Sequence, residues 1–159
     1  MDDDLTPKPP SASVAQSVNL AFPNDANVHG TVFGGRVMSW IDEVGALAAM
    51  RHARRPVVTA LIDAVAFCIP VRVGDIAVID AIVTRAWTTS MEVWVTVHTE
   101  NPFEDTRQTA AEAYLTFVSV DPDGKPQPVR PVRPETPDER RRFDEAQARR
   151  DHRLAVRRT

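Results

Sequence analysis

The chain has 159 residues, of which 43% are hydrophobic and 26% are charged, the proportions of a globular domain with a single core. Its net charge of −3 gives no basis for nucleic-acid or anionic-membrane binding. The apolar runs are too short to cross a bilayer, and the acidic, proline-rich first residues lack the apolar core of a signal peptide. We therefore expect a cytoplasmic protein.

Cysteine and histidine usage argues against redox and metal chemistry. The single cysteine, Cys68, lies in the apolar run Val65–Ile69, which predicts a buried and unreactive thiol with no disulfide partner. A catalytic cysteine would need a positioned base, and no histidine is close in sequence. The four histidines have no metal-ligand spacing, so we expect no metal site and no cofactor.

The first half of the chain predicts one strand and one long helix. Residues 1–13 are polar and rich in proline, which is typical of disorder. Residues Ala15–Phe22 alternate loosely and predict a first strand, and the Asn and Asp side chains of residues 23–27 favour a tight turn. A loop with paired glycines then leads into a helix over 35–53, whose apolar residues recur at helical spacing. Because this helix has little polar surface, we expect it to be buried on most sides.

Four stretches with β-branched residues and period-two alternation follow, at 57–67, 76–84, 91–98 and 106–120. The third alternates most clearly, as a strand with one buried face would, with Glu92 on the polar side. A proline-rich connector precedes a charged helix over Pro137–Arg158, whose mixed charges indicate a solvated helix. We predict an α+β fold in which a curved antiparallel sheet wraps one long central helix. The predicted segments are a disordered 1–13, a domain over 14–134, and a C-terminal helix and tail over 135–159.

One carboxylate occupies an unusual position. Asp42 lies two turns into the apolar helix, where burial of a charge is costly unless the group is paired or functional. The structural alternative is a salt bridge with Arg36 or Arg85 at a subunit interface. Glu43 points about 100° away and is expected at the surface.

Gly34 and Gly35 stand at the start of the same helix. A helix N-terminus carries unpaired N–H donors and a positive dipole end, so these donors are suited to hold the oxyanion of a tetrahedral intermediate. Paired glycines before a helix also serve simple capping, and only their combination with an Asn-containing loop and a helical Asp points to catalysis.

Several motifs follow one another in a specific order over roughly residues 19–150. They are Pro23-x-Asp25-Ala26-Asn27-x-x-Gly30-x-x-Phe33-Gly34-Gly35, Met38-x-Trp40-Ile41-Asp42-Glu43, Val57-Val58-Thr59, Asp63-x-Val65-x-Phe67-x-x-Pro70-x-x-x-Gly74-Asp75, Thr89-Ser90-Met91-Glu92-Val93, and the tail motifs Pro134-Glu135-Thr136 and Ala146-x-x-Arg149-Arg150. This pattern resembles the hotdog-fold acyl-CoA thioesterases, in particular the bacterial broad-range acyl-CoA hydrolases and the mammalian cytosolic and brain enzymes.

The resemblance implies a hydrolase that converts acyl-CoA to free fatty acid and CoA. Asp42 matches the general base, Asn27 the loop residue that orients water or substrate, and Gly35 the backbone donor to the carbonyl oxygen. Asn27 and Asp42 would come from two subunits of a dimer, and the family implies a trimer of dimers. The further substrate-binding residues that we expect are Gly34, His29, Thr59, Thr89, Ser90 and Arg54.

Several features leave alternatives open. Similar sequences read Gly-Arg where this chain reads Trp87-Thr88, which removes a cation suited to a CoA phosphate. A non-catalytic acyl-CoA sensor on the same fold is the rival function, although a pure binder has no need of a carboxylate beside its ligand. His29 has a loop-stabilising alternative, and Arg54 a helix-dipole alternative. The small residues Gly45, Ala46 and Ala49 are expected to let two helices approach across a dimer axis.

Overall fold

The computed structural model describes residues 4–158 and contains one five-stranded antiparallel sheet. The strands are β1 (Ala15–Leu20), β2 (Val57–Phe67), β3 (Ile76–Ala86), β4 (Ser90–Asn101) and β5 (Thr106–Ser119). Their order across the sheet is β1-β3-β4-β5-β2, so β1 and β2 form the two edges. Each predicted strand is present, with ends shifted by a few residues.

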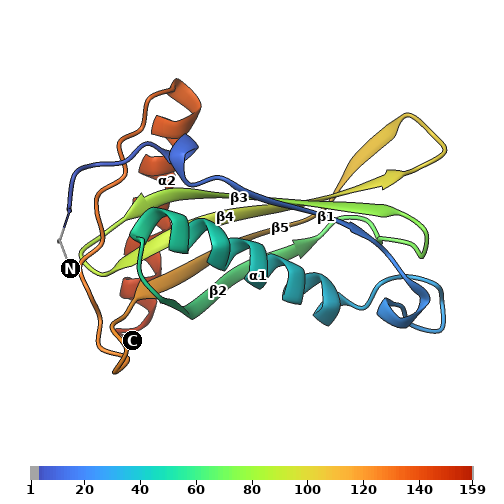
Figure 1. Ribbon diagram of the computed structural model, residues 1–159, viewed down its shortest axis with the longest axis horizontal. Coiled ribbons are helices and arrows are strands. Elements are labelled where there is room, and N and C mark those ends of the chain that lie inside the picture. The colour runs from blue at the N-terminus through green and yellow to red at the C-terminus, as the bar shows by residue number, and fades with distance from the viewer. Residues whose placement is uncertain (1–3, 159) are drawn as a thin grey trace.

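The long helix α1 (Gly34–Ala53) crosses one face of this sheet (Figure 1). Its buried residues recur at helical spacing and pack on the apolar side chains of the central strands, which form the core. Gly45 permits the close approach, because a Cβ atom at this position would lie 3.3 Å from the ring of Phe117 on β5. The predicted role of Gly45 and Ala49 between two helices is therefore wrong, since both are buried against their own sheet.

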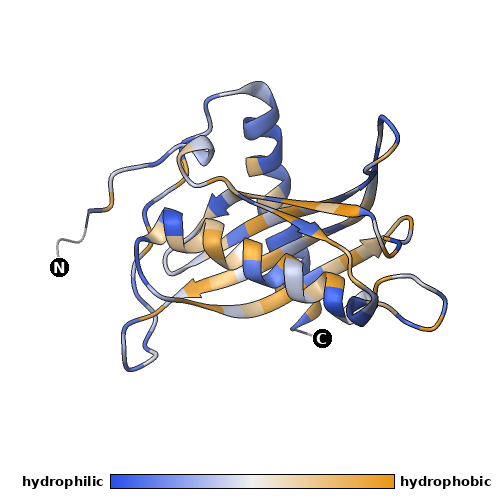
Figure 2. Ribbon diagram, turned by 45° about the vertical axis from the view of Figure 1, so that its right-hand side comes forward, coloured by the Kyte–Doolittle hydropathy of each residue, from blue (hydrophilic) through white to orange (hydrophobic). Residues whose placement is uncertain are grey.

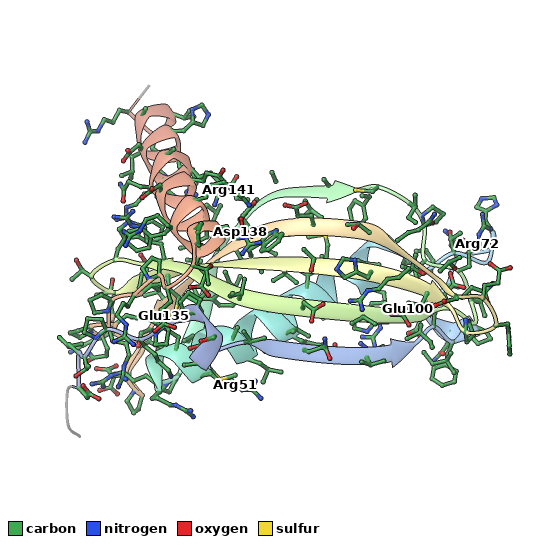
Figure 3. The ribbon with its side chains drawn as sticks, turned by 90° about the horizontal axis from the view of Figure 1, so that it is seen from above. Arg51, Arg72, Glu100, Glu135, Asp138 and Arg141 are labelled. Carbon is green, nitrogen blue, oxygen red and sulfur yellow. The ribbon has the colours of Figure 1, made fainter. Side chains whose placement is uncertain are left out.

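The C-terminal helix α2 (Pro137–Val156) packs on the opposite face of the sheet, at one end (Figure 1; Figure 3). It is mostly hydrophilic, whereas the strands are largely hydrophobic (Figure 2). Arginines of α2 pack on aromatic rings of the sheet: the Arg142 guanidinium lies 4.4 Å from the centre of the Trp94 ring, and that of Arg149 lies 3.8 Å from the centre of the Tyr114 ring. The prediction of a solvated helix is thus wrong for the face that meets the sheet.

Burial under α2 also changes the environment of Glu92. The sequence pattern places Glu92 on the polar side of β4, but its side chain is fully buried. Arg149 donates two hydrogen bonds to its carboxylate, at 3.0 and 2.7 Å, and the Thr84 hydroxyl donates a third at 2.7 Å. The buried charge of Glu92 is thus paired with Arg149, and these hydrogen bonds offset the cost of burying the carboxylate beneath α2.

The N-terminal segment is ordered from residue 4 onward, in contrast to the predicted disorder of 1–13; residues 1–3 lie outside the described part. The backbone of Lys8 pairs with the proline-rich connector through Pro131 and Arg133, at 3.0 and 2.9 Å. Ser13 is buried and lies 3.4 Å from Nδ1 of His52. Prolines lose little conformational freedom on folding, so few contacts are needed to order the segment.

Candidate functional site

The Asp42 carboxylate is held by one hydroxyl group. Thr59, on β2, donates a hydrogen bond of 2.7 Å from its Oγ1 to Oδ1 of Asp42. Asp42 is half-buried on the side of α1 that faces away from the core. Among residues 4–158, Thr59 is its one polar partner, which leaves the second carboxylate oxygen open to a group from outside the chain.

The two predicted salt-bridge partners of Asp42 are engaged elsewhere. Arg36 pairs with Asp25 at 3.1 Å and lies 5.2 Å from the Trp40 ring. Arg85 donates to the Phe143 carbonyl oxygen at 3.1 Å and lies 3.9 Å from the ring of the same residue. Within residues 4–158 of one chain neither arginine pairs with Asp42, and a salt bridge across a subunit interface stays a prediction.

The start of α1 presents free backbone donors. Arg36 and Val37 both donate their N–H groups to the Phe33 carbonyl, at 3.0 and 3.1 Å, whereas the N–H groups of Gly34 and Gly35 have no acceptor within residues 4–158. A Cβ atom at Gly35 would meet nothing within 4 Å, so space lies open beside this donor. Two unpaired donors at the positive end of a helix form a site suited to an oxyanion.

Asn27 organises the loop before α1. Its Oδ1 accepts hydrogen bonds from the backbone N–H groups of His29 and Thr31, at 2.9 and 3.3 Å, and its Nδ2 donates to the Thr31 hydroxyl at 2.9 Å. The His29 side chain is exposed, so the loop-stabilising contribution of this residue comes from its backbone. Asp25 fixes the other side of the loop by accepting the Phe22 N–H at 3.0 Å and the Arg36 side chain. The sequence analysis did not predict this role of Asp25, although the residue lies within the loop motif that contains Asn27.

Within one chain these groups do not meet. Asp42 is seven residues beyond Gly35, so helical rise separates them by about 10 Å. No hydrogen bond joins Asn27 to Asp42 among the interactions of residues 4–158. One protomer therefore offers two half-sites, one at the helix start and one at mid-helix.

An apolar pocket of about 350 Å³ adjoins the helix start. It lies between Gly34 and Val37 on α1, the end of β2, and Ala110 and Ala111 on β5. Cys68 lines it and is exposed, so the predicted burial of this thiol is wrong. Cys68 follows β2, an edge strand whose outer side has no neighbouring strand among residues 4–158. An apolar run in the sequence does not show whether its strand lies at an edge.

The predicted residues Thr89 and Ser90 lie on the other face of the sheet. They line a groove of about 260 Å³ between the start of β2, β5 and the end of α2. Arg150 of α2 enters this groove, with its guanidinium 3.3 Å from the Ser90 hydroxyl and 4.6 Å from the Trp87 ring. Sequence reasoning missed Arg150 as a partner of Ser90, because the two are far apart in the chain.

Arg54 ends α1 in the left-handed conformation, with φ of 53°, and its side chain is exposed. It lies in a positive region with Lys8, whose pKa is lowered by burial and further by Arg54 and Arg130. Residues 4–158 contain no group of three or more His, Cys, Asp or Glu side chains that could hold a metal ion. In the same part of the chain, no helix is long and apolar enough to cross a membrane.

Comparison with solved structures identifies this sheet and helix as a hotdog fold. A hexameric acyl-CoA thioesterase superposes with a TM-score of 0.92 at 42% identity, over 95% of this chain and 97% of that chain. An acyl-CoA hydrolase from Staphylococcus aureus, in complex with butyryl coenzyme A and coenzyme A, gives a TM-score of 0.88 at 43% identity, over 94% of this chain and 92% of that one.

Sequence comparison agrees. The Thioesterase superfamily profile matches residues 29–104. The uncharacterized acyl-CoA thioester hydrolase YkhA of Bacillus subtilis is 46% identical over 118 residues, which cover 74% of this chain and 69% of the relative. The cytosolic acyl coenzyme A thioester hydrolase of Homo sapiens is 38% identical over 91% of this chain, which spans only 39% of that relative's length. The chain belongs to the thioesterase superfamily.

Proposed function

We propose that the protein hydrolyses acyl-CoA thioesters to a free fatty acid and CoA, with Asp42 as general base. The observation that carries the proposal is the half-buried Asp42 carboxylate on α1, which accepts a hydrogen bond of 2.7 Å from Thr59 on β2. A carboxylate whose orientation is fixed in this way is suited to proton abstraction. The names of the related hydrolases and the coenzyme A complex of the Staphylococcus aureus enzyme support the substrate class.

The chemistry needs only water and the thioester. Asp42 removes a proton from a water molecule, whose oxygen forms a bond to the carbonyl carbon. The Gly35 N–H, with Gly34 beside it, stabilises the negative charge that develops on the carbonyl oxygen. Collapse of the tetrahedral intermediate breaks the carbon–sulfur bond, and the CoA thiolate takes up the proton that Asp42 had accepted.

This mechanism requires two protomers, because the helix separates Asp42 from Gly35 by about 10 Å. We propose a dimer in which antiparallel α1 helices lie side by side, so that the start of one helix is near the middle of the other. Asn27 and Gly35 of one protomer then join Asp42 of its partner. The half-exposed apolar side chains of Leu47 and Met50, on the outer side of α1, are the surface that such a dimer covers.

The assembly and the residue roles have support among the relatives. Solved structures include a hexameric acyl-CoA thioesterase, and we propose a trimer of dimers here. Solved variants of the Staphylococcus aureus enzyme replace one asparagine, one aspartate and one threonine by alanine. Those three residues have the same separations along their chain as Asn27, Asp42 and Thr59. Mammalian relatives are named cytosolic, and we propose the cytoplasm as the compartment.

The first experiment compares Asp42→Asn with Glu43→Gln, which changes the neighbouring exposed carboxylate. Loss of a positioned base should lower kcat about 10²- to 10⁴-fold, while Glu43→Gln keeps wild-type turnover. Release of free thiol from a panel of acyl-CoA esters measures the rate, and circular dichroism checks the fold. Retention of near-wild-type hydrolysis by Asp42→Asn would refute the mechanism. Binding of CoA without hydrolysis of any ester by the wild type would identify a sensor instead.

The second experiment tests the shared site by mixing an Asn27→Ala variant with an Asp42→Ala variant. In a mixed dimer, one site carries both lesions and the other carries none. Hydrolysis should therefore return on subunit exchange, to at most half of the wild-type value per dimer. Mixtures that exchange fully, as native mass spectrometry can verify, and yet stay inactive would show that the residues do not pair across the interface.

A further inference from the structure

The two glycines at the start of α1 have no side chains that could fix the direction of their N–H groups. Space lies open beside Gly35, where a Cβ atom would meet nothing within 4 Å. Glycine also has more backbone freedom than any other residue. Yet an oxyanion site is effective only when its donors already point at the position where the charge develops. The direction of the Gly34 and Gly35 N–H groups therefore depends on the residues on either side of the pair.

Asp25 contacts both sides of the glycine pair. On the N-terminal side, its carbonyl oxygen accepts the N–H of Phe33, the residue before α1, at 3.1 Å. On the C-terminal side, its Oδ1 accepts a hydrogen bond of 3.1 Å from Nε of Arg36. The N–H of Arg36 donates to the Phe33 carbonyl at 3.0 Å. These contacts close a hydrogen-bonded ring around the first turn of α1.

The charged members of this ring are themselves held in place. The second carboxylate oxygen of Asp25 accepts the Phe22 N–H at 3.0 Å, so both oxygens are engaged, and the side chain is only 13% exposed. The Arg36 guanidinium lies 5.2 Å from the centre of the ring of Trp40, one turn further along α1, and Trp40 is buried in the core. A planar guanidinium between a carboxylate and an aromatic ring has little freedom to turn.

We propose that Asp25 is a positioning residue for the hydrolysis. Through Phe33 and Arg36 it fixes the angle between the loop and the first turn of α1, and with it the direction of the oxyanion donors. The inference rests on the proposed function and adds a residue to the half-site at the helix start. In this role Asp25 contacts neither the thioester nor the water. A displacement of about 1 Å in a catalytic site can cost a factor of about 10² in rate, so a contact that only orients the donors is important for turnover.

Loss of the Asp25 contacts should tilt the donors without unfolding the loop. Backbone hydrogen bonds hold the loop on its other side, from the Val32 N–H to the Val71 carbonyl at 2.8 Å and from the Val73 N–H to the Gly30 carbonyl at 3.0 Å. Neither bond involves Asp25. A variant at this position thus keeps the loop docked on the segment before β3 and opens only the ring at the helix start.

The first test is a double-mutant cycle on the hydrolysis of butyryl-CoA, followed by release of free thiol. Asp25→Asn keeps an acceptor for the Phe22 N–H and removes the acceptor of Arg36. It should lower kcat about tenfold, with KM and the melting temperature unchanged. Arg36→Gln, at a half-exposed position, should have the same effect. Because both changes open one contact, the double variant should lose no more than either single variant.

The matched control is Asp121→Asn. Asp121 also organises a loop, since its Oδ1 accepts the backbone N–H groups of Asp123 and Lys125 at 2.9 Å each, but this turn follows β5 and does not contact the start of α1. Asp121→Asn should keep wild-type kcat and KM.

Subunit mixing shows on which half-site Asp25 acts. In a mixed dimer of Asp25→Asn and Asp42→Ala, one site combines an intact helix start with an intact carboxylate. Hydrolysis should therefore rise on exchange, from about a tenth to about half of the wild-type value per dimer. A mixture of Asp25→Asn with Asn27→Ala should show no such rise, because both lesions then lie at helix starts.

Each outcome supports or overturns the inference. A kcat of Asp25→Asn equal to that of wild type would overturn it, and so would a higher kcat, since Arg36 would then act on the oxyanion through a charge that Asp25 opposes. Losses that multiply in the double variant would also overturn it, because they show two independent roles. Absence of hydrolysis by the wild type refutes the proposed function instead. If Asn27→Ala and Asp42→Ala fail to complement each other, the shared site is wrong and the cycle alone decides on Asp25.

Discussion

Acidification should destabilise the fold through His52. This side chain is fully buried, with Nε2 2.8 Å from the Arg130 carbonyl oxygen and Nδ1 3.4 Å from the Ser13 hydroxyl. Burial, together with the positive charges of Lys8 and Arg130, lowers the pKa of His52 from 6.5 to about 4, against the opposing effect of the hydrogen bond to the Arg130 carbonyl. The folded protein thus keeps the imidazole neutral at pH values where the unfolded chain binds a proton.

The sign of the effect follows from this difference. The contribution of neutral His52 to stability is fully present above pH 6.5, decreases as the pH falls below 6.5, and levels off near pH 4, where the folded protein also binds the proton. The whole window corresponds to about 3 kcal/mol of unfolding free energy. Between pH 7 and pH 5 the expected loss is about 2 kcal/mol.

Equilibrium unfolding in guanidinium chloride at these two pH values, at fixed protomer concentration, measures the loss. His52→Gln removes the titrating group and keeps a side-chain donor for the Arg130 carbonyl. Wild type should lose about 2 kcal/mol more than His52→Gln between pH 7 and pH 5. His152→Gln, at an exposed position on α2, serves as the control and should behave like wild type. Equal losses for wild type and His52→Gln would refute the reasoning.

Three further predictions concern stability and turnover. Arg149→Met leaves the buried Glu92 carboxylate without its cation and should lower the unfolding free energy by about 3–5 kcal/mol. The double variant with Glu92→Leu should recover most of this loss. Equal unfolding free energies for the single and the double variant would contradict the buried ion pair. Thr136→Ala removes the N-cap of α2, which accepts the Glu139 N–H at 3.1 Å, and should cost about 1 kcal/mol in the same denaturation assay. Thr59→Val deletes the donor to Asp42 and should lower kcat about tenfold with the melting temperature retained; unchanged thiol release would count against this positioning role.

Periodicity predicted the strands and α1 well because one face of each element packs on a single core. The alternating pattern of β4 correctly identifies the residues that face the core. It cannot show whether the opposite face of the strand is in contact with water or is covered by a charged helix. Glu92 therefore looked exposed although α2 buries it. The pattern of α2 misled for the same reason, since arginines that stack on Trp94 and Tyr114 resemble surface charges in sequence.

The candidate site was only partly predictable. Asp42 stood out as a carboxylate within an apolar helix, and Gly34 and Gly35 as donors at a helix start. The Thr59 contact depends on how β2 lies beside α1, which no local pattern encodes. The exposure of Cys68 was not predicted, because it depends on the position of β2 at the edge of the sheet. The order of the N-terminal segment was not predicted either, because it depends on hydrogen bonds between Lys8 and the distant connector around Pro131.

The way α2 attaches to the sheet has a consequence for synthesis of the chain. All five strands leave the ribosome before α2 does, so the outer face of the sheet is in contact with water for a time. The residues that α2 will cover there include Trp87, Trp94 and Tyr114, which have polar atoms, rather than a continuous aliphatic strip. Until α2 docks, the nascent sheet therefore exposes aromatic rings, to which other unfinished chains can bind. The arginines of α2 cover these rings only at the last step, so docking of the final helix removes this surface from contact with other chains.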